Sequence, residues 1–526
     1  MTPNFLLLTP EFILAGVGIL VLLIDFITPR ASRGDLGWLA LTGLALAVVV
    51  ALFHRGGTVD TLYDGLFRVD AYSTFAFVFL GVLGGAVIVA SMDYVLRHID
   101  HVGEYYGLLI LSVLGMVLMA SAGELLTAYI ALELMTFSLY VMVSLERRGK
   151  TDEAGTKYII LGALSSAVLL YGISMVWGAT GTTTYDGIAA VLSQGGGDST
   201  LVVGLALILA GVGFKVAAVP FHMWAPDVYQ GAPTPVTAYL AIGSKAAVFI
   251  WALRLFGEGL IPAAADWRIL LAVLATATMV LGNLVAIVQR NIKRLLAYSS
   301  IGQAGYLLAG VAALGKVGDG GVTISVLASN GVLLHLVGYA VSTLAAFLVV
   351  ITVYNARGSD EIDDYGGLAK RSPFLAMVMA VALFSLAGLP FFAGFTTKFY
   401  LFTGVASSGF LWLAGLGVAA SLVSLYYYLR VIKVMYIDAP APDAEPVEAA
   451  SSTPRPQQVG EGGGKPGEGL LAEPVPDEVG LNSASPIPIS RVSWTLLATL
   501  LGAMVLIGVW PTRLVDVIDS ASRFLR

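Results

Sequence analysis

Long apolar runs fill most of this sequence, and their length constrains the fold more than any other feature. Most of the runs extend over about 18–25 residues, the length that crosses the apolar core of a bilayer as an α-helix. Hydrophobic residues make up 57% of the 526 residues and charged residues 12%, whereas soluble domains carry about 25% charged residues. The runs lack the alternating pattern of a membrane β-barrel. The sequence therefore predicts an all-α polytopic membrane protein.

The composition also excludes several kinds of site. The chain contains no cysteine, so disulfides, thiolate metal sites and cysteine-bound iron–sulfur clusters are excluded within it. The formal net charge of −6 is small and gives no signal for nucleic-acid binding. The first apolar run follows MTPNF without a basic start or a small-residue cleavage site, so we predict a retained helix.

We expect about fourteen membrane spans. They lie near residues 10–28, 35–53, 72–96, 105–121, 124–144, 154–178, 200–219, 235–256, 267–288, 295–313, 323–353, 374–404, 409–436 and 492–510. Most of the 29 lysine and arginine residues follow odd-numbered spans. Because positively charged loops stay in the cytoplasm, we predict these loops on the cytoplasmic side and both termini on the outer side.

Proline interrupts two of these spans. The span near 200–219 carries Lys215 and leads into a stretch with four prolines between Pro220 and Pro235. The run 374–404 contains Gly388-Leu389-Pro390, so we predict a broken helix there as well. Irregular backbone at membrane depth is stable only where it is buried in protein or lines a wet cavity. Both breaks therefore mark candidate functional sites.

The spans predict two five-helix units. The fourth span of each unit is interrupted by proline and carries a lysine, Lys215 or Lys398. Because each unit has an odd number of spans, the second unit would be inverted relative to the first. The predicted organisation is three N-terminal helices in 1–104, the first unit in 105–256, the second in 257–437, a flexible Pro/Gly/Glu-rich cytoplasmic loop in 438–491 and a last helix in 492–526.

Four charged residues lie deep inside predicted spans, namely Glu133, Lys215, Lys245 and Lys398. A charged group at membrane depth costs from about 2.5 to more than 10 kcal/mol, so four of them together indicate a polar path. A lysine whose distance from a carboxylate can change would gain or lose a proton near neutral pH, so Glu133 and Lys215 could form a switchable proton carrier. Alternatively, this pair only holds two helices together, and Lys398 extends toward the interface.

Other polar residues could complete such a path. Ser244 precedes Lys245, and His335 could relay protons between the units or could be a core histidine with satisfied hydrogen bonds. His222 could organise the first break through hydrogen bonds, or could accept a proton at its cytoplasmic mouth. A polar patch, useful for packing or for holding water, is formed by Tyr298, Ser299, Ser300 and Gln303.

Three motifs give the sequence a family resemblance. They are PFHMWAPDVYQGAPTPVTAYL, KRLLAYSSIGQAGY and SLAGLPFFAGFTTKFYLF. These motifs resemble the antiporter-like membrane subunits of respiratory complex I and of the related multisubunit cation/proton antiporters. Within this family, the lysine of the third motif and the opening TPEFILAGVGILVLLIDF look like subunit N of bacterial NADH-quinone oxidoreductase (subunit 2 in mitochondria and plastids). Subunit M has a glutamate in place of that lysine.

The resemblance implies a fold of fourteen helices with two inverted five-helix repeats and broken seventh and twelfth helices. It also implies that protons move along a central chain of titratable residues. Glu133 matches the glutamate of span 5, Lys215 the lysine of span 7, Lys245 the bridging lysine of span 8 and Lys398 the lysine of span 12. One departure is Gln303, which stands where relatives often have a histidine and cannot carry a proton. His335 is then the possible substitute.

The function implied by the resemblance is that of a translocase subunit in the bacterial cytoplasmic membrane. It would couple NADH:quinone electron transfer in other subunits to proton pumping through this chain. NADH, FMN, iron–sulfur clusters and quinone are then expected in partner subunits and no cofactor in this chain. The expected partners are the antiporter-like subunit M, the small subunits K and J, and lipid. A subunit of a multisubunit Na⁺/H⁺ antiporter without redox activity remains an alternative, as does a purely structural membrane spacer.

Overall fold

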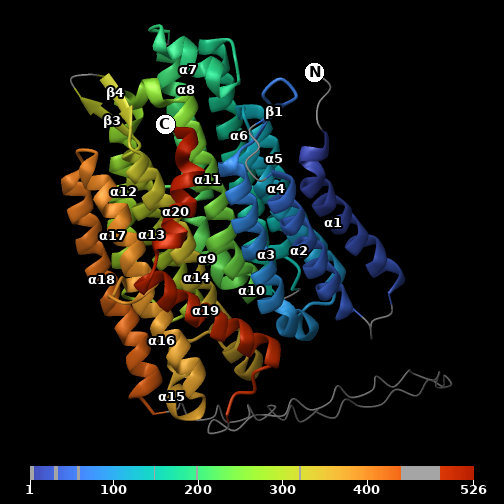
Figure 1. The fold of residues 1–526 in the computed structure, drawn as a ribbon. Coiled ribbons are helices and arrows are strands. Elements are labelled where there is room, and N and C mark those ends of the chain that lie inside the picture. Colours follow the sequence, from blue (N-terminus) through green and yellow to red (C-terminus); the bar gives the residue numbers. More distant parts are fainter. Residues whose placement is uncertain are drawn as a thin grey trace, which may run out of the picture.

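The computed structural model describes residues 5–28, 33–55, 60–146, 149–196, 199–318, 321–439 and 486–525. Helices that run side by side dominate this part of the chain, and two short β-hairpins accompany them (Figure 1). Twelve of the described helices are long and apolar enough to cross a membrane, which confirms the predicted all-α polytopic membrane fold. Most of the predicted loop 438–491 lies outside the described residues.

The N-terminal helices pack consecutively against one another, and α1 and α3 also contact the first helix of the next unit. The N-terminal elements are η1 (Phe5–Leu8), α1 (Thr9–Ile27), α2 (Asp35–Arg55), a hairpin of β1 (Asp60–Leu62) and β2 (Phe67–Val69), and α3 (Ala71–His98). The hairpin strands are antiparallel, and Asp60 pairs with Val69. Asp70 then begins α3 by accepting a hydrogen bond from the backbone N–H of Ser73, whose hydroxyl in turn accepts one from the N–H of Asp70.

The segment that we predict as the first unit follows directly. It consists of α4 (Val102–Ser121), α5 (Leu125–Val143), α6 (Gly149–Thr180), the short helix α7 (Tyr185–Ser193), α8 (Ser199–Lys215), α9 (Trp224–Gly231), α10 (Thr234–Tyr239), η3 (Leu240–Ser244), α11 (Lys245–Arg254) and η4 (Leu255–Gly259). The segments η3 and η4 are turns of π-helix, so the continuous rod from α10 to η4 is α-helical only in part.

The second unit and the C-terminal helices complete the bundle. They consist of η5 (Ile261–Ala263), α12 (Ala264–Ala286), α13 (Ile292–Ala312), a hairpin of β3 (Gly315–Gly318) and β4 (Gly321–Ile324), α14 (Val326–Arg357), η6 (Ile362–Tyr365), α15 (Leu368–Arg371), α16 (Pro373–Ala387), α17 (Ala393–Ser407), α18 (Leu411–Tyr436), α19 (Arg491–Val509), α20 (Thr512–Ala521) and η7 (Ser522–Leu525). The helices α7, α15 and α20 and both hairpins were not anticipated, because each is too short to leave a membrane-span signal.

Both predicted breaks are present. The helix α8 ends at Lys215 and α9 begins at Trp224, while α16 ends at Ala387 and α17 begins at Ala393. The second break turns at Gly388, whose φ of +88° is a left-handed conformation that favours glycine. Counting each broken pair as one span, the described helices are consistent with about fourteen spans.

The two ends of the bundle differ, and we name them after the short helices they carry. The α7 end holds α7 and both hairpins, and the α15 end holds α15 (Figure 1). Residues 234–257 are all buried, and α13 and α14 are almost so. These central helices therefore bring the two units together.

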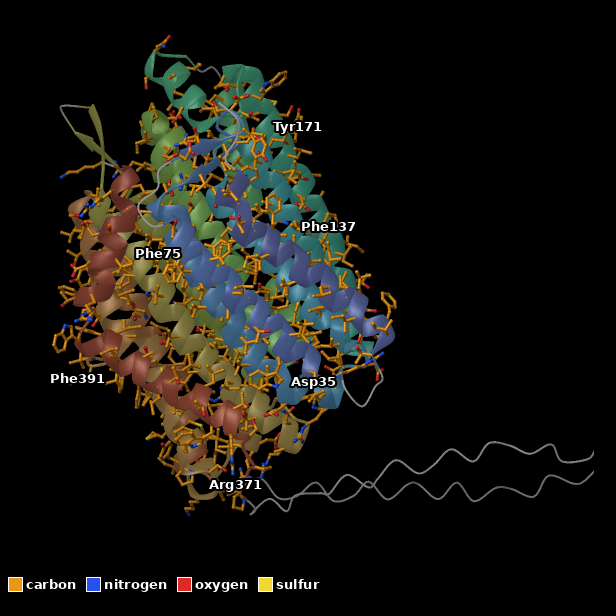
Figure 2. The ribbon with its side chains drawn as sticks, turned by 45° about the vertical axis from the view of Figure 1, so that its right-hand side comes forward. Asp35, Phe75, Phe137, Tyr171, Arg371 and Phe391 are labelled. Carbon is orange, nitrogen blue, oxygen red and sulfur yellow. The ribbon has the colours of Figure 1, made fainter. Side chains whose placement is uncertain are left out.

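The outer faces carry exposed apolar side chains. Phe137 and Tyr171 project from the first unit, and Phe391 projects from the second break (Figure 2). Their exposed fractions are 62%, 60% and 75% respectively. A surface of this kind suits contact with lipid acyl chains rather than water.

Candidate functional site

The first buried charge pair joins α8 to α5. Lys215 is the last residue of α8, and its Nζ lies 3.8 Å from Oε1 of Glu133. The lysine also donates hydrogen bonds to the hydroxyls of Ser166 at 3.0 Å and Thr136 at 3.4 Å. A separation of 3.8 Å is too long for a hydrogen bond, and Oε1 has no hydrogen-bond partner among the described residues. The ammonium is thus held by hydroxyls, with the carboxylate close beside it.

Aromatic side chains pack against one another at the first break. The indole N–H of Trp224 donates a 2.9 Å hydrogen bond to the carbonyl of Phe214, one residue before Lys215. The Trp224 ring stacks on Tyr158 and Phe214 with centroid distances of 4.8 and 5.4 Å. The same carbonyl also accepts a 3.0 Å hydrogen bond from the backbone N–H of Ala217, so both interactions lie at the end of α8. They fix where α8 stops and so where Lys215 lies.

Lys245 links the first unit to the second. It is the first residue of α11, is 1% exposed, and its Nζ donates to the backbone carbonyl of Ser300 on α13 at 3.1 Å. It also contacts the Ser300 hydroxyl and lies 5.8 Å from the ring centroid of Tyr229. Ser244 does not contribute to this contact, because its hydroxyl donates to the carbonyl of Leu240 in the preceding turn.

His335 lies on α14 between two partners. Its Nδ1 is 3.1 Å from the Thr397 hydroxyl on α17, and its Nε2 is 3.1 Å from Oε1 of Gln303 on α13. Gln303 donates through Nε2 to the carbonyl of Leu386 at 3.1 Å, so its Oε1 is left to accept. This arrangement assigns the ring proton of a neutral His335 to Nε2 and leaves Nδ1 to accept from Thr397.

Lys398 binds the backbone that the second break leaves free. Its Nζ donates to the carbonyl of Leu386 at 2.7 Å and to the hydroxyl of Ser421 at 2.7 Å. The same Leu386 carbonyl accepts the hydrogen bond from Gln303. His335, Gln303, Leu386 and Lys398 therefore form one hydrogen-bonded network. An apolar groove of about 520 Å³ between α17 and α18 adjoins the lysine.

The remaining expected residues lie elsewhere. Ser299 on α13 contacts the Tyr428 hydroxyl on α18. Tyr298, also on α13, is half-buried. His222 lies in the turn between α8 and α9, and its Nδ1 is buried without a hydrogen-bond partner among the described residues. The structure thus brings Glu133 to Lys215, and Gln303 to His335 and Lys398, but leaves Ser244 and Tyr298 outside these contacts.

Several residues that contact the buried lysines and His335 were not predicted from the sequence. Ser166, Thr136, Thr397 and Ser421 hold the lysines or the histidine. Each is a single hydroxyl in an apolar run, and such residues commonly bond to their own helix. Only their position opposite a charge distinguishes them, and that position depends on tertiary packing.

A polar cavity of about 430 Å³ opens near the α15 end beside the first break. The Tyr94 hydroxyl donates to Glu146 at 2.7 Å on one wall, and Lys293 pairs with Asp360 at 3.1 Å on another. Gly231, the last residue of α9, also lines this cavity. Water could therefore approach the segment between the first break and Lys245 from this end.

An ion pair network fixes α9 next to this cavity. Asp227 lies 2.7 Å from Arg294 and 3.0 Å from Lys157. Partial burial opposes ionisation of the carboxyl, but the hydrogen bonds from Arg294 and Lys157 outweigh it and hold the pKa of Asp227 below its ordinary value. Asp227 thus connects α9 to α6 and α13 as a charged group.

This chain is similar to known proteins in both sequence and structure. The family described as "NADH:quinone oxidoreductase/Mrp antiporter, TM" matches residues 122–424. The chain is 45% identical over 442 residues to NADH-quinone oxidoreductase subunit N of Desulforamulus reducens, covering 84% of this chain and 90% of that protein. It is 44% identical over 448 residues to the protein of the same name from Moorella thermoacetica, covering 85% and 92%.

Solved structures give the same picture for the fold. A chain of respiratory complex I from Thermus thermophilus with bound aureothin is 28% identical, with a TM-score of 0.72 over 97% of this chain and 100% of that one. A chain of the Mrp complex from Dietzia sp. is 21% identical, with a TM-score of 0.81 over 100% and 98%. The second likeness, at this low identity, concerns the fold alone.

Proposed function

Because this chain belongs to the NADH:quinone oxidoreductase/Mrp antiporter membrane family, we propose that it is a proton-translocating membrane subunit of a complex I-type NADH-quinone oxidoreductase. The relatives named subunit N cover more than four-fifths of the chain at 44–45% identity. This similarity favours the redox-coupled complex over a subunit of a Na⁺/H⁺ antiporter. The chain would act as part of a translocase and would carry out no redox chemistry by itself.

The observation that carries this proposal is the row of buried charged and titratable side chains through the central helices. Glu133 and Lys215 form the start of the row in the first unit. Lys245 lies where the two units meet, and His335 and Lys398 form the end of the row in the second unit. Isolated charges at membrane depth are costly. A row that extends across both units is expected of a proton route rather than of a spacer.

The geometry supports a specific sequence of proton transfers. The Glu133 carboxylate lies near the Lys215 ammonium without a direct hydrogen bond, so a small movement between α5 and α8 would change the attraction that keeps Lys215 protonated. A proton lost from Lys215 would pass to Lys245, which already contacts the second unit through Ser300. His335 would relay protons toward Lys398, and Gln303 would orient the imidazole by accepting from its Nε2, because an amide cannot itself carry a proton.

The partner subunits would supply the driving chemistry. We assign NADH, FMN, iron–sulfur clusters and quinone to other subunits, and for the clusters this follows from the lack of cysteine in the chain. Subunits M, K and J are the proposed neighbours, together with lipid on the apolar faces. The location is the bacterial cytoplasmic membrane. Basic residues gather in the loops at the α15 end, such as Lys370 and Arg371 in α15, so this end is assigned to the cytoplasm and both termini to the outer side.

The test replaces the two members of the first pair. In the assembled complex, Glu133→Ala or Lys215→Ala should reduce proton pumping and coupled quinone reduction by about tenfold or more, while the complex still assembles. Proton uptake by inside-out vesicles driven by NADH measures this directly. Lys157→Ala is the matched control, because Lys157 is a half-exposed lysine paired with Asp227 at the α15 end. Normal proton stoichiometry in both variants of the pair would remove the proposed switch.

A further inference from the structure

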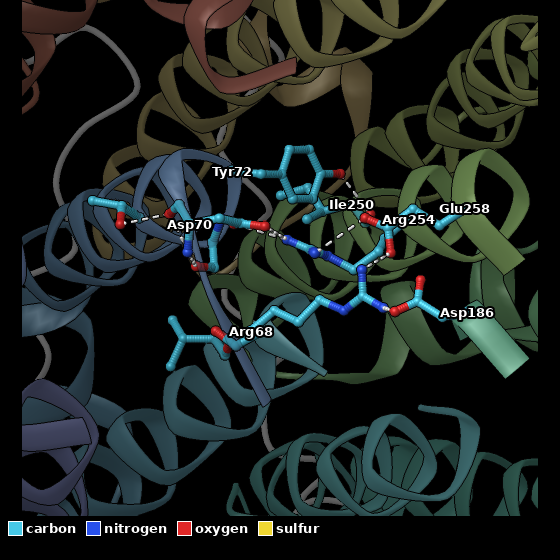
Figure 3. Close-up of polar contacts among 11 residues, drawn as sticks. Arg68, Asp70, Tyr72, Asp186, Ile250, Arg254 and Glu258 are labelled. Atoms are coloured by element: carbon cyan, nitrogen blue, oxygen red, sulfur yellow. Dashed lines mark hydrogen bonds and ion pairs between the residues drawn. The ribbon is translucent and has the colours of Figure 1, made fainter. Parts of the chain in front are cut away.

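A second group of charged side chains lies at the α7 end and takes no part in the row described above. Arg254, the last residue of α11, is fully buried, and its Nη2 lies 2.9 and 2.8 Å from the two carboxylate oxygens of Asp70 (Figure 3). Its Nη1 lies 3.3 Å from Glu258. Arg68 pairs with Glu258 at 2.7 Å and with Asp186 at 2.8 Å. We name these five residues the Arg254 cluster.

The Arg254 cluster ties α11 to three other parts of the chain. Asp70 caps the start of α3, Arg68 belongs to β2, and Asp186 belongs to α7. The ring of Tyr72 on α3 lies 5.0 Å from the guanidinium, and its hydroxyl donates a 2.6 Å hydrogen bond to the carbonyl of Ile250. The outer end of α11 is therefore fixed both by ion pairs and by its own backbone.

The same helix carries a lysine of the proposed proton route at its other end. Lys245 is the first residue of α11 and Arg254 the last, about 13 Å apart along the axis at 1.5 Å per residue. Every residue of α11 is buried. Whatever fixes the rotation of Arg254 about the helix axis therefore also fixes the direction in which Lys245 points.

The rotational register of α11 needs such a constraint. A π-helical turn precedes it at η3 and another follows it at η4. A π-turn holds one residue more than an α-turn, and in a long helix the extra residue can be accommodated at different places. If the π-turn at η3 became a regular α-turn, the whole of α11 would rotate by about 100°, which would turn Lys245 away from Ser300 and Arg254 away from Asp70.

The residues between the two charges discriminate poorly between registers. The sequence from Ala246 to Leu253 is AAVFIWAL, and apolar side chains of this kind can repack at modest cost. Arg254 is far more selective, because its guanidinium holds Nη2 against Asp70 and Nη1 against Glu258 at the same time. Buried ion pairs contribute little net stability, but they can specify register.

We propose that Arg254 is a positioning residue for Lys245, and that its pairing with Asp70 and Glu258 fixes the register in which Lys245 meets Ser300. This inference rests on the proposed role of Lys245 in proton transfer. Arg254 touches none of the groups that carry protons, so it acts only through the rotation of α11.

The test uses Arg254→Lys in the assembled complex. The lysine keeps the positive charge but has one nitrogen, so it cannot replace both the contact of Nη2 with Asp70 and that of Nη1 with Glu258. We expect proton pumping to fall by about tenfold or more, as misplacement of a transfer group does, and the pH profile of pumping to shift. A merely structural defect would lower the amount of complex but leave the pH profile of the remaining activity unchanged. Glu258→Gln should give the same change to a smaller degree.

A cross-linking readout tests the register without relying on pumping. The chain has no cysteine of its own, so Lys245→Cys and Ser300→Cys introduce a unique pair for a short thiol-to-thiol cross-linker. We expect a high yield with Arg254 in place and a clearly lower yield with Arg254→Lys. Equal yields and an unchanged pH profile would overturn the inference. If Lys245→Ala pumps normally, the proposed role of Lys245 fails, while the cross-linking still reports on the register.

Arg268→Lys is the matched control. Arg268 on α12 also lies at the α7 end, where it donates to the carbonyl of Ser408 at 2.8 Å and stacks on Phe410 at 4.5 Å. It holds α12 to the turn between α17 and α18 and belongs to neither α11 nor the Arg254 cluster. Its replacement should leave the cross-linking yield and the pH profile unchanged. A loss in both variants alike would show that any arginine at this end has the effect, and would overturn the inference.

Discussion

At the scale of single residues, the second half of the row depends on a side chain that cannot titrate. Gln303 accepts from His335 through Oε1 and donates to the Leu386 carbonyl through Nε2. That carbonyl also accepts from Lys398. A glutamine is thus able to connect a histidine to a lysine because its amide both donates and accepts.

Replacing Gln303 should interrupt this connection. Gln303→Leu removes both hydrogen bonds and leaves Nε2 of His335 facing an apolar group. Loss of a buried partner costs about 1–3 kcal/mol, which corresponds to about a five- to 150-fold decrease in the transfer rate. Proton pumping driven by NADH in vesicles measures the effect. Gln303→His should retain pumping, because an imidazole can donate and accept in the same place.

Ser299→Ala is the control for this series. Ser299 lies one turn away on α13 and contacts Tyr428 instead of the histidine. It should pump like the natural chain. Full activity in Gln303→Leu would mean that protons reach Lys398 without passing His335.

At the scale of elements, the breaks could be predicted from sequence, whereas the π-turns could not. Proline and glycine punctuate both breaks, since proline removes a donor and Gly388 adopts a positive φ. The segments η3 (LAIGS) and η4 (LFGEG) contain glycine but no proline. Their geometry arises from packing within the bundle, which a single sequence does not reveal. The hydroxyls of Ser166 and Ser421 were missed for the same reason.

The short helix α9 gives a prediction on pH. Asp227 has a lowered pKa because Arg294 and Lys157 outweigh its partial burial. The ion pairs therefore stabilise the fold at pH values above the ordinary carboxyl pKa of about 4, and this stabilisation is lost as the pH falls through the lower pKa of the folded state. Asp227→Asn should lower the free energy of unfolding by less than about 1 kcal/mol at pH 7, because solvent screens these partly exposed charges.

Thermal melting of the purified full chain in detergent at neutral and acidic pH checks this sign. The difference between the natural chain and Asp227→Asn should be largest near pH 7 and should shrink as Asp227 becomes protonated. Asp438→Asn is the control, since Asp438 pairs with the exposed Lys433 five residues earlier. A difference that grew in acid would contradict the assignment of Asp227 as a charged tie.

At the scale of the whole molecule, the two units meet through buried central helices rather than through their lipid-facing surfaces. Lys245 on α11 reaches Ser300 on α13, and Tyr339 on α14 donates to the Ala241 carbonyl in η3 at 3.0 Å. Composition and charge placement were sufficient to predict a membrane bundle with a polar interior. The contacts between the two units could not be predicted, because they depend on which faces of three separate helices come together.

The choice between a redox-coupled subunit and a Na⁺/H⁺ antiporter is a prediction about the whole assembly. The charges of the row are lysines, one glutamate and a histidine, which exchange protons, whereas sodium needs several oxygen ligands. In proteoliposomes that contain the purified complex, NADH-driven proton pumping should remain within about twofold when choline replaces Na⁺. Lys398→Ala should abolish most of that pumping in either salt. Proton movement that required Na⁺, or that persisted as Na⁺/H⁺ exchange without NADH, would favour the antiporter instead.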